Sequence, residues 1–169
     1  MFDYEIYTDG GYSMSENVGG FAYVILQDGK EIKRFSQKVE HETNNRAEIK
    51  AIMEGVFSLP NGCSVIVYSD SQYALGVLSG GYKAKKNTDL VFRYKAEVRR
   101  RNLRVTYKWV RGHNGNEWNE ICDALCTEAA GVDLNPHRKE KKSSVSSLSD
   151  EELTNLLSEV MEEIERRGL

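Results

Sequence analysis

The sequence predicts an α/β fold with a five-stranded mixed sheet, helices on both of its faces, and a C-terminal amphipathic helix. Two observations lead to this prediction. Strand-like and helix-like segments follow in the order β-β-β-α-β-α-α-β-α, and the composition changes after residue 131. Three strands joined by hairpins form antiparallel pairs, whereas strands that alternate with helices form parallel ones. Both kinds of pairing are therefore expected in one sheet.

Alternating or continuous apolar runs indicate the strands. Gly10-Gly11 is expected to end the first strand, and Asp28-Gly29 is typical of a hairpin turn between the second and third. The fourth run is apolar throughout, which predicts a strand buried on both faces. We also expect Trp109, at the end of the fifth strand, to lie in the core. The expected strands cover residues 2–9, 21–26, 31–39, 65–68 and 105–109.

Capping residues and apolar spacing indicate four helices in the same part of the chain. The first follows Thr43, Asn44 and Asn45 and stops near Pro60. A short second helix is capped at residues 69–71 and ends at 80–81, and the third covers about 89–101. The last is expected near 117–130. This segment order leaves room for a polar loop just before the last helix.

Charge is distributed unevenly along the 169 residues, although the formal net charge is only −3. Residues 83–111 hold eleven Lys or Arg against two acids, a net +9, whereas residues 150–167 hold seven acids against two Arg, a net −5. The basic stretch is consistent with a surface that faces phosphates, and equally with a solvated helix face. No stretch approaches the roughly 18 apolar residues that span a membrane.

Three cysteines, an odd number, and an acidic N-terminus without an apolar run favour reduced thiols in a cytoplasmic protein without a signal peptide. Cys122 and Cys126, together with His113, could form part of a zinc site. The pattern lacks a fourth ligand at zinc-finger spacing. Packed core thiols are the favoured interpretation.

Four acidic residues stand where the predicted fold would bring them together. Asp9 and Asp70 follow strands expected in the sheet interior, and the carboxyl ends of such strands form the reactive crevice of open α/β sheets. Glu48 lies one turn into a helix expected to cross the same end, and Asp123 lies on the last helix. Clustered carboxylates repel one another unless a cation binds them, and their oxygens suit Mg²⁺ or Mn²⁺.

Five sequence blocks, in order from about residue 3 to residue 130, resemble ribonuclease H of type 1. They cover roughly three quarters of the chain. A single Thr-Asp-Gly would be weak support, but five blocks in register with the predicted elements are specific. The blocks are Tyr-Thr-Asp-Gly at 7–10, Thr-Asn-Asn-Arg-Ala-Glu at 43–48, Ser-Asp-Ser-Gln-Tyr at 69–73, Trp-Val-Arg-Gly-His at 109–113 and Asn-Glu-Ile-Cys-Asp at 119–123.

The resemblance implies a ribonuclease H-like fold and an endonuclease that hydrolyses the RNA strand of RNA–DNA hybrids, leaving 5′-phosphate and 3′-hydroxyl ends. It implies two Mg²⁺ ions, with Mn²⁺ as a substitute. Asp9 would bridge both ions, and Glu48 and Asp70 would complete one site. Asp123 would complete the other, and His113 would assist proton transfer or product release. The alternatives are a retroelement-derived nuclease that also cuts double-stranded RNA, and a non-catalytic hybrid-binding module.

The resemblance also implies contacts with the hybrid. Asn44 and Gln72 match residues that contact the minor groove or the 2′-hydroxyl group, which distinguishes RNA from DNA. Thr43 and Asn87 match a pocket that holds a phosphate of the DNA strand. Thr43 and Asn44 could also be helix caps, and the two roles are compatible.

The chain departs from the family pattern in two places. Residues 12–18 lack the Gly-Asn-Pro-Gly stretch of many members, which leaves Ser15 or Asn17 to make that 2′-hydroxyl contact. Residues 78–89 are too few for the basic handle of many bacterial relatives. We therefore expect weaker, salt-sensitive hybrid binding. The basic residues expected to replace the handle in part are Lys83, Lys85, Lys86, Arg99, Arg100 and Arg101.

The expected organisation is a catalytic domain at 1–131, a linker at 132–148 and a helical extension at 149–169. The extension carries one apolar stripe. The stripe is expected to dock on its own domain, with self-association or a protein partner as the alternatives. It consists of Leu153, Leu156, Leu157, Val160, Met161 and Ile164.

Overall fold

The computed structural model describes residues 2–112 and 115–134. By its contacts the chain divides into Met1–Leu134 and Asn135–Leu169. His113, the predicted linker beyond residue 134 and the predicted helix at 149–169 lie outside the described residues. In the described part, no helix is long and apolar enough to cross a membrane.

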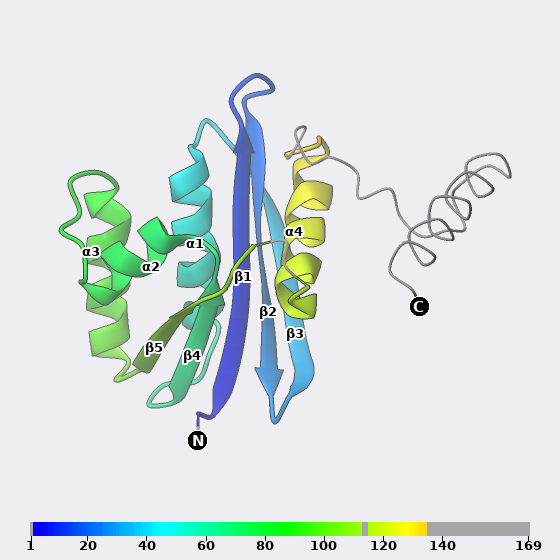
Figure 1. Cartoon of the computed structure of the whole chain (residues 1–169). Helices are drawn as coiled ribbons and strands as arrows, with labels where there is room; N and C mark the ends of the chain where they lie inside the picture. The colour runs from blue at the N-terminus through cyan, green and yellow to red at the C-terminus, as the bar shows by residue number, and fades with distance from the viewer. Residues whose placement is uncertain (1, 113–114, 135–169) are drawn as a thin grey trace, which may run out of the picture. The chain divides into compact units, whose positions relative to one another are not determined.

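The predicted order of elements is confirmed for the described residues, which form five strands and four helices (Figure 1). The strands are β1 (Tyr4–Ser13), β2 (Val18–Gln27), β3 (Lys30–Glu40), β4 (Ser64–Ser69) and β5 (Arg104–Trp109). The helices are α1 (Asn44–Phe57), α2 (Gln72–Ser79), α3 (Thr88–Arg100) and α4 (Glu117–Ala130).

The sheet is mixed, as predicted, with the strand order β3-β2-β1-β4-β5. β2 pairs antiparallel with β1 and β3, whereas β4 pairs parallel with β1 and β5. In this register Tyr7 lies opposite Tyr68 of β4, and Asp9 lies opposite Ala22 of β2. β1 and β4 therefore occupy the interior of the sheet, and their carboxyl ends point the same way.

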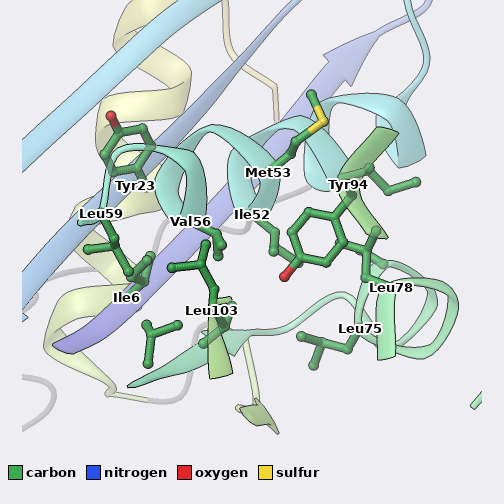
Figure 2. Close-up of a cluster of buried hydrophobic side chains, with 14 of the residues drawn as sticks. Ile6, Tyr23, Ile52, Met53, Val56, Leu59, Leu75, Leu78, Tyr94 and Leu103 are labelled. Atoms are coloured by element: carbon green, nitrogen blue, oxygen red, sulfur yellow. The ribbon is translucent and has the colours of Figure 1, made fainter. Parts of the chain in front are cut away.

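Helices cover both faces of the sheet, which confirms the predicted layers. α1 packs on one face against β1 and β2, and α4 packs on the other against β1, β2 and β3. The α1 face carries the largest hydrophobic cluster, to which α2 and α3 also contribute, through residues such as Leu75, Leu78 and Tyr94 (Figure 2). This core holds the helices against the strands that carry the candidate site.

The prediction that Gly10-Gly11 ends the first strand is wrong, since β1 continues to Ser13. Gly10 instead allows α1 to approach β1 closely. A Cβ at Gly10 would overlap the backbone of α1 at Ala47 and Glu48. On the other face, a Cβ at Gly20, which lies opposite Gly11, would overlap the Cys126 carbonyl of α4.

Two burial predictions also need correction. Trp109 is 47% exposed rather than in the core, because it ends the edge strand β5. In β4, Val65 and Val67 are buried on the α1 face, but Ile66 and Tyr68 are only half-buried, because α4 covers β1 to β3. The α4 face of β4 is thus more open than its apolar sequence predicts.

The predicted packing of the cysteines is confirmed. Cys63, Cys122 and Cys126 are free and buried. The Cys122 thiol donates a hydrogen bond to the Tyr7 carbonyl (3.3 Å), and the Cys126 thiol donates to the Gly20 carbonyl (2.9 Å). These contacts attach α4 to β1 and β2.

Candidate active site

Four carboxylates from four elements interact around Asp9. Asp9 lies half-buried on β1, Asp70 follows β4, Glu48 comes from α1 and Asp123 from α4. Desolvation raises the pKa of Asp9 well above its ordinary value, and the negative charges of Asp70, Asp123 and Glu48 raise it further. A hydrogen bond from the Gly10 N–H (2.8 Å) opposes this shift. The fold therefore brings together the four predicted acids.

Two side chains orient the Glu48 carboxylate. The Ser71 hydroxyl donates to Oε2, and the Asn44 amide donates to Oε1 at 2.9 Å. Desolvation raises the pKa of Glu48, and the charge of Asp70 adds to this effect while the two hydrogen bonds oppose it. The Asn44 oxygen accepts from the Tyr12 N–H (3.1 Å), which links α1 to the end of β1.

The loop after β5 lies directly against Asp70. A Cβ on Gly112 would overlap the Asp70 carboxylate. The Trp109 indole N–H donates to the Asp70 carbonyl at 3.0 Å. Trp109 and Gly112, three residues apart in one sequence block, thus pack against the backbone and the side chain of the same acid.

The carboxylate chemistry fits a divalent cation. The oxygens of the four carboxylates are hard ligands, and a bound cation would offset the repulsion that raises the pKa of Asp9. Within residues 2–112 and 115–134, however, no group of three or more His, Cys, Asp or Glu side chains is arranged to hold a metal ion as it stands. The acids interact through their charges without forming a closed ligand set.

Arg46 contacts both residues that are predicted to hold a DNA phosphate. Its backbone N–H donates to Oγ1 of Thr43 (3.3 Å), which caps α1, and its guanidinium donates to Oδ1 of Asn87 (3.5 Å). Asn87, just before α3, donates its amide N–H to the Tyr73 hydroxyl at 3.1 Å. Thr43 therefore contacts the backbone of Arg46, whereas Asn87 contacts its guanidinium, which also pairs with Glu42 and Asp89.

The other predicted contacts belong to α2 and to the hairpin after β1. Gln72, the first residue of α2, is exposed and lines a groove of about 360 Å³ together with Tyr82 and Trp109. In the hairpin after β1, Ser15 is exposed. The Asn17 amide oxygen accepts from the Tyr12 hydroxyl, and its amide nitrogen contacts His41. The Ser15 hydroxyl contacts the Ser13 hydroxyl at 3.1 Å.

One of the basic residues that were expected to replace the handle in part does not belong to the exposed basic surface. Lys83, Lys85, Lys86 and Arg99 are exposed. The Arg101 guanidinium is instead used inside the fold, where it donates to the carbonyls of Phe57 and Leu59 and to Asn61. Arg101 is therefore a structural residue, and its inclusion in the phosphate-facing set is wrong. Arg100 pairs with Glu97 at 2.6 Å.

Several residues at the site were not singled out from the sequence. Ser71 was expected only as a helix cap, yet its hydroxyl serves both Ala74 N–H and Glu48. Arg46, Gly112 and the buried Asn119 had no assigned role. All four lie inside the five sequence blocks, so their position in those blocks was the available signal.

Comparisons with known proteins point to one family. A family model described as RNase H matches residues 2–131. Ribonuclease H of Thermoanaerobacter sp. (strain X514) is 39% identical over 140 residues, covering 73% of this chain and 87% of the relative. Ribonuclease H of Syntrophus aciditrophicus (strain SB) is 36% identical over 146 residues, covering 75% and 79%.

Solved structures agree on the fold. LC11-RNase H1, isolated from compost by a metagenomic approach, is 26% identical with a TM-score of 0.63, covering 78% of this chain and 97% of that one. LC11-RNase H1 in complex with an RNA/DNA hybrid is 24% identical with a TM-score of 0.65, covering 76% and 96%.

Proposed function

The chain belongs to the ribonuclease H family and is a ribonuclease H, and from this premise we propose that it hydrolyses the RNA strand of RNA–DNA hybrids with two divalent cations. The observation that carries the proposal is the interaction of Asp9 with Asp70, Asp123 and Glu48. A module that only bound hybrids would have no use for four carboxylates that raise one another's pKa. The proposed products carry 5′-phosphate and 3′-hydroxyl ends.

We assign the ligands as the family resemblance implies. Asp9 would contact both cations, with Glu48 and Asp70 at one and Asp123 at the other. Mg²⁺ is the proposed ion, and Mn²⁺ the substitute. When bound, such a pair activates a water nucleophile and stabilises the leaving oxygen of an in-line displacement.

The surrounding residues restrict the motion of these acids. Ser71 and Asn44 each donate a hydrogen bond to one carboxylate oxygen of Glu48. These two bonds limit the rotation of the carboxylate. Trp109 holds the backbone of Asp70, and Gly112 leaves room for its carboxylate. Such support keeps reacting groups within a narrow range of geometry. His113 is proposed to assist proton transfer or product release.

The hybrid is proposed to lie across the exposed residues beside the acids. Asn44 and Gln72 would contact the minor groove, and Ser15 is the proposed 2′-hydroxyl contact of the hairpin. Thr43 and Asn87 would hold a DNA phosphate, supported by Arg46, whose backbone N–H contacts Thr43 and whose guanidinium contacts Asn87. Because Glu42 and Asp89 already pair with Arg46, a phosphate there would replace part of an existing ion-pair network.

A cleavage assay tests the proposal. Labelled hybrid, double-stranded RNA and DNA duplex are incubated with the full chain in Mg²⁺, in Mn²⁺ and with EDTA. We expect metal-dependent cleavage of the hybrid alone, with 5′-phosphate product ends. Cleavage of double-stranded RNA would favour the retroelement-derived alternative.

The variant Asp70→Asn separates an enzyme from a binding module. It should abolish cleavage and keep hybrid affinity, because the loss of one ligand charge affects the cations more than the basic surface. Full turnover in Asp70→Asn would contradict the assigned role. Absence of cleavage in the wild type, with tight hybrid binding, would favour the non-catalytic module.

Two further proposals concern the whole chain. Three buried free thiols support a cytoplasmic location. We also propose the boundaries 1–131, 132–148 and 149–169, with the apolar stripe of the last segment docking on its own domain. Light scattering before and after deletion of residues 143–169 distinguishes this from self-association, which would give a dimer that the deletion converts to a monomer.

A further inference from the structure

α4 buries a polar side chain among the residues that face the sheet. Asn119 is 1% exposed, and within the described residues neither Oδ1 nor Nδ2 has a hydrogen-bond partner. Its backbone N–H donates to Oδ1 of Asn116 at 3.1 Å, so the cap of the helix fixes its position. A buried amide without a partner costs stability, and each such group in a native protein calls for an explanation.

The position of Asn119 relates it to the acids. Asp123 follows four residues later on the same face of the helix, is 3% exposed, and interacts with Asp9. The two buried thiols of α4 do have backbone partners, since Cys122 and Cys126 donate to the carbonyls of Tyr7 and Gly20. Asn119 is thus the unsatisfied polar residue next to the proposed cation ligand.

We propose that Asn119 is a positioning residue that hydrogen-bonds the hydration shell of the divalent cation held by Asp9 and Asp123. Mg²⁺ gives up its water reluctantly and usually keeps several molecules when it binds to carboxylates. A water of that shell donates outward, and the Asn119 Oδ1 is an acceptor with no other donor in the described fold. This inference rests on the proposed function.

A structural role and a cation-linked role predict different behaviour. Leucine has nearly the shape of asparagine without its polar atoms, so Asn119→Leu removes a buried unsatisfied group. The variant should therefore be more stable than the wild type without metal. If Asn119 also holds the hydration shell, the same variant should bind Mg²⁺ more weakly. A side chain that only fills space would leave Mg²⁺ affinity unchanged.

Calorimetric titration with MgCl₂ alone, and thermal unfolding with and without MgCl₂, test the proposal on the full chain. We expect Asn119→Leu to raise the Tm of the metal-free protein and to weaken Mg²⁺ affinity by about tenfold, the lower end of the range for groups that support metal ligands. Cys126→Ala, a buried change on the same helix face, should keep wild-type Mg²⁺ affinity.

A second pair of variants covers the case in which leucine does not fit. Asn119→Ala should weaken Mg²⁺ binding as leucine does, and Asn119→Ser should recover part of the affinity, because its hydroxyl can accept from water. Equal Mg²⁺ affinity in the wild type and in both apolar variants would overturn the role of Asn119 alone. A wild-type chain that binds no Mg²⁺ would overturn the proposed metal site as well.

Discussion

The Ser71 hydroxyl connects the first turn of α2 to the Glu48 carboxylate of α1. It accepts from the Ala74 N–H at 3.2 Å and donates to Oε2 of Glu48. One hydroxyl therefore satisfies a free N–H at the start of a helix and orients a proposed cation ligand. We therefore expect a change at this position to affect both stability and activity.

Ser71→Ala should lower both quantities. The loss of the cap should reduce the free energy of unfolding by about 1 kcal/mol, measured by urea denaturation. Hybrid cleavage should also fall, because Glu48 loses one of its two orienting hydrogen bonds. Ser71→Thr keeps the hydroxyl and serves as the control. Wild-type cleavage in Ser71→Ala would show that Asn44 alone positions Glu48.

Gly10→Ala should destabilise the fold by about 1–3 kcal/mol, the usual cost of overpacking. The added methyl group would overlap the backbone of Ala47 and Glu48, which cannot move without displacing α1. The matched control is Gly81→Ala, because a Cβ there meets its nearest atom, Oγ of Ser79, at an ordinary 3.5 Å. Equal unfolding free energies for the two variants would contradict the close approach of α1 to β1.

Asp89→Asn should remove a pH-dependent contribution to stability. Hydrogen bonds from Arg46 are the main cause that lowers the pKa of Asp89 from 3.8 to about 2. A carboxyl group whose pKa is lower in the folded state stabilises the fold above its unfolded pKa and loses this effect as the pH falls through the folded one. The difference in unfolding free energy between wild type and variant should therefore be constant above about pH 5. It should shrink between pH 3.8 and about 2.

Urea denaturation from pH 6 to 2.5 measures this difference. The effect should be small, because the Asp89 side chain is 61% exposed and solvent screens its pairing with Arg46. A difference that does not change with pH would show that the ion pair is not kept in solution.

The double variant Lys85→Ala/Lys86→Ala should bind the hybrid more weakly, and its affinity should depend less steeply on salt concentration. Both side chains are exposed in the basic stretch before α3. Each phosphate contact that is lost should make the log–log slope of affinity against salt less steep by about 0.9. Lys38→Ala, on the edge strand β3 and paired with Glu40, is the control and should keep the wild-type slope. An unchanged slope in the double variant would place the hybrid elsewhere.

The sequence predicted the elements and the four acids because both leave local signals. The caps Thr43 and Ser71, the turn at Asp28-Gly29 and the apolar periodicity indicate where helices and strands begin. The acids stand in recognisable blocks near the ends of these elements. Local patterns were therefore sufficient for the order of elements and for naming four acids that the fold brings together.

The errors concern relationships between distant segments. Gly10 resembles a strand breaker until α1 is placed against it, and Trp109 resembles a core residue until β5 is placed at the edge of the sheet. Arg101 belongs to a basic run, but its partners Phe57 and Leu59 are more than 40 residues away. The buried, unsatisfied amide of Asn119 likewise appears only after α4 is packed on the sheet.

The pairing of Asp9 with Ala22 has a consequence for how this hairpin can change in evolution. Neighbouring residues of a strand point to opposite faces, so slippage by one position would turn the Asp9 carboxylate away from Asp123. An inserted or deleted residue at the exposed tip, 14–17, must therefore be absorbed in the tip itself. The length of the tip can therefore change, while the ladder below it tolerates no shift.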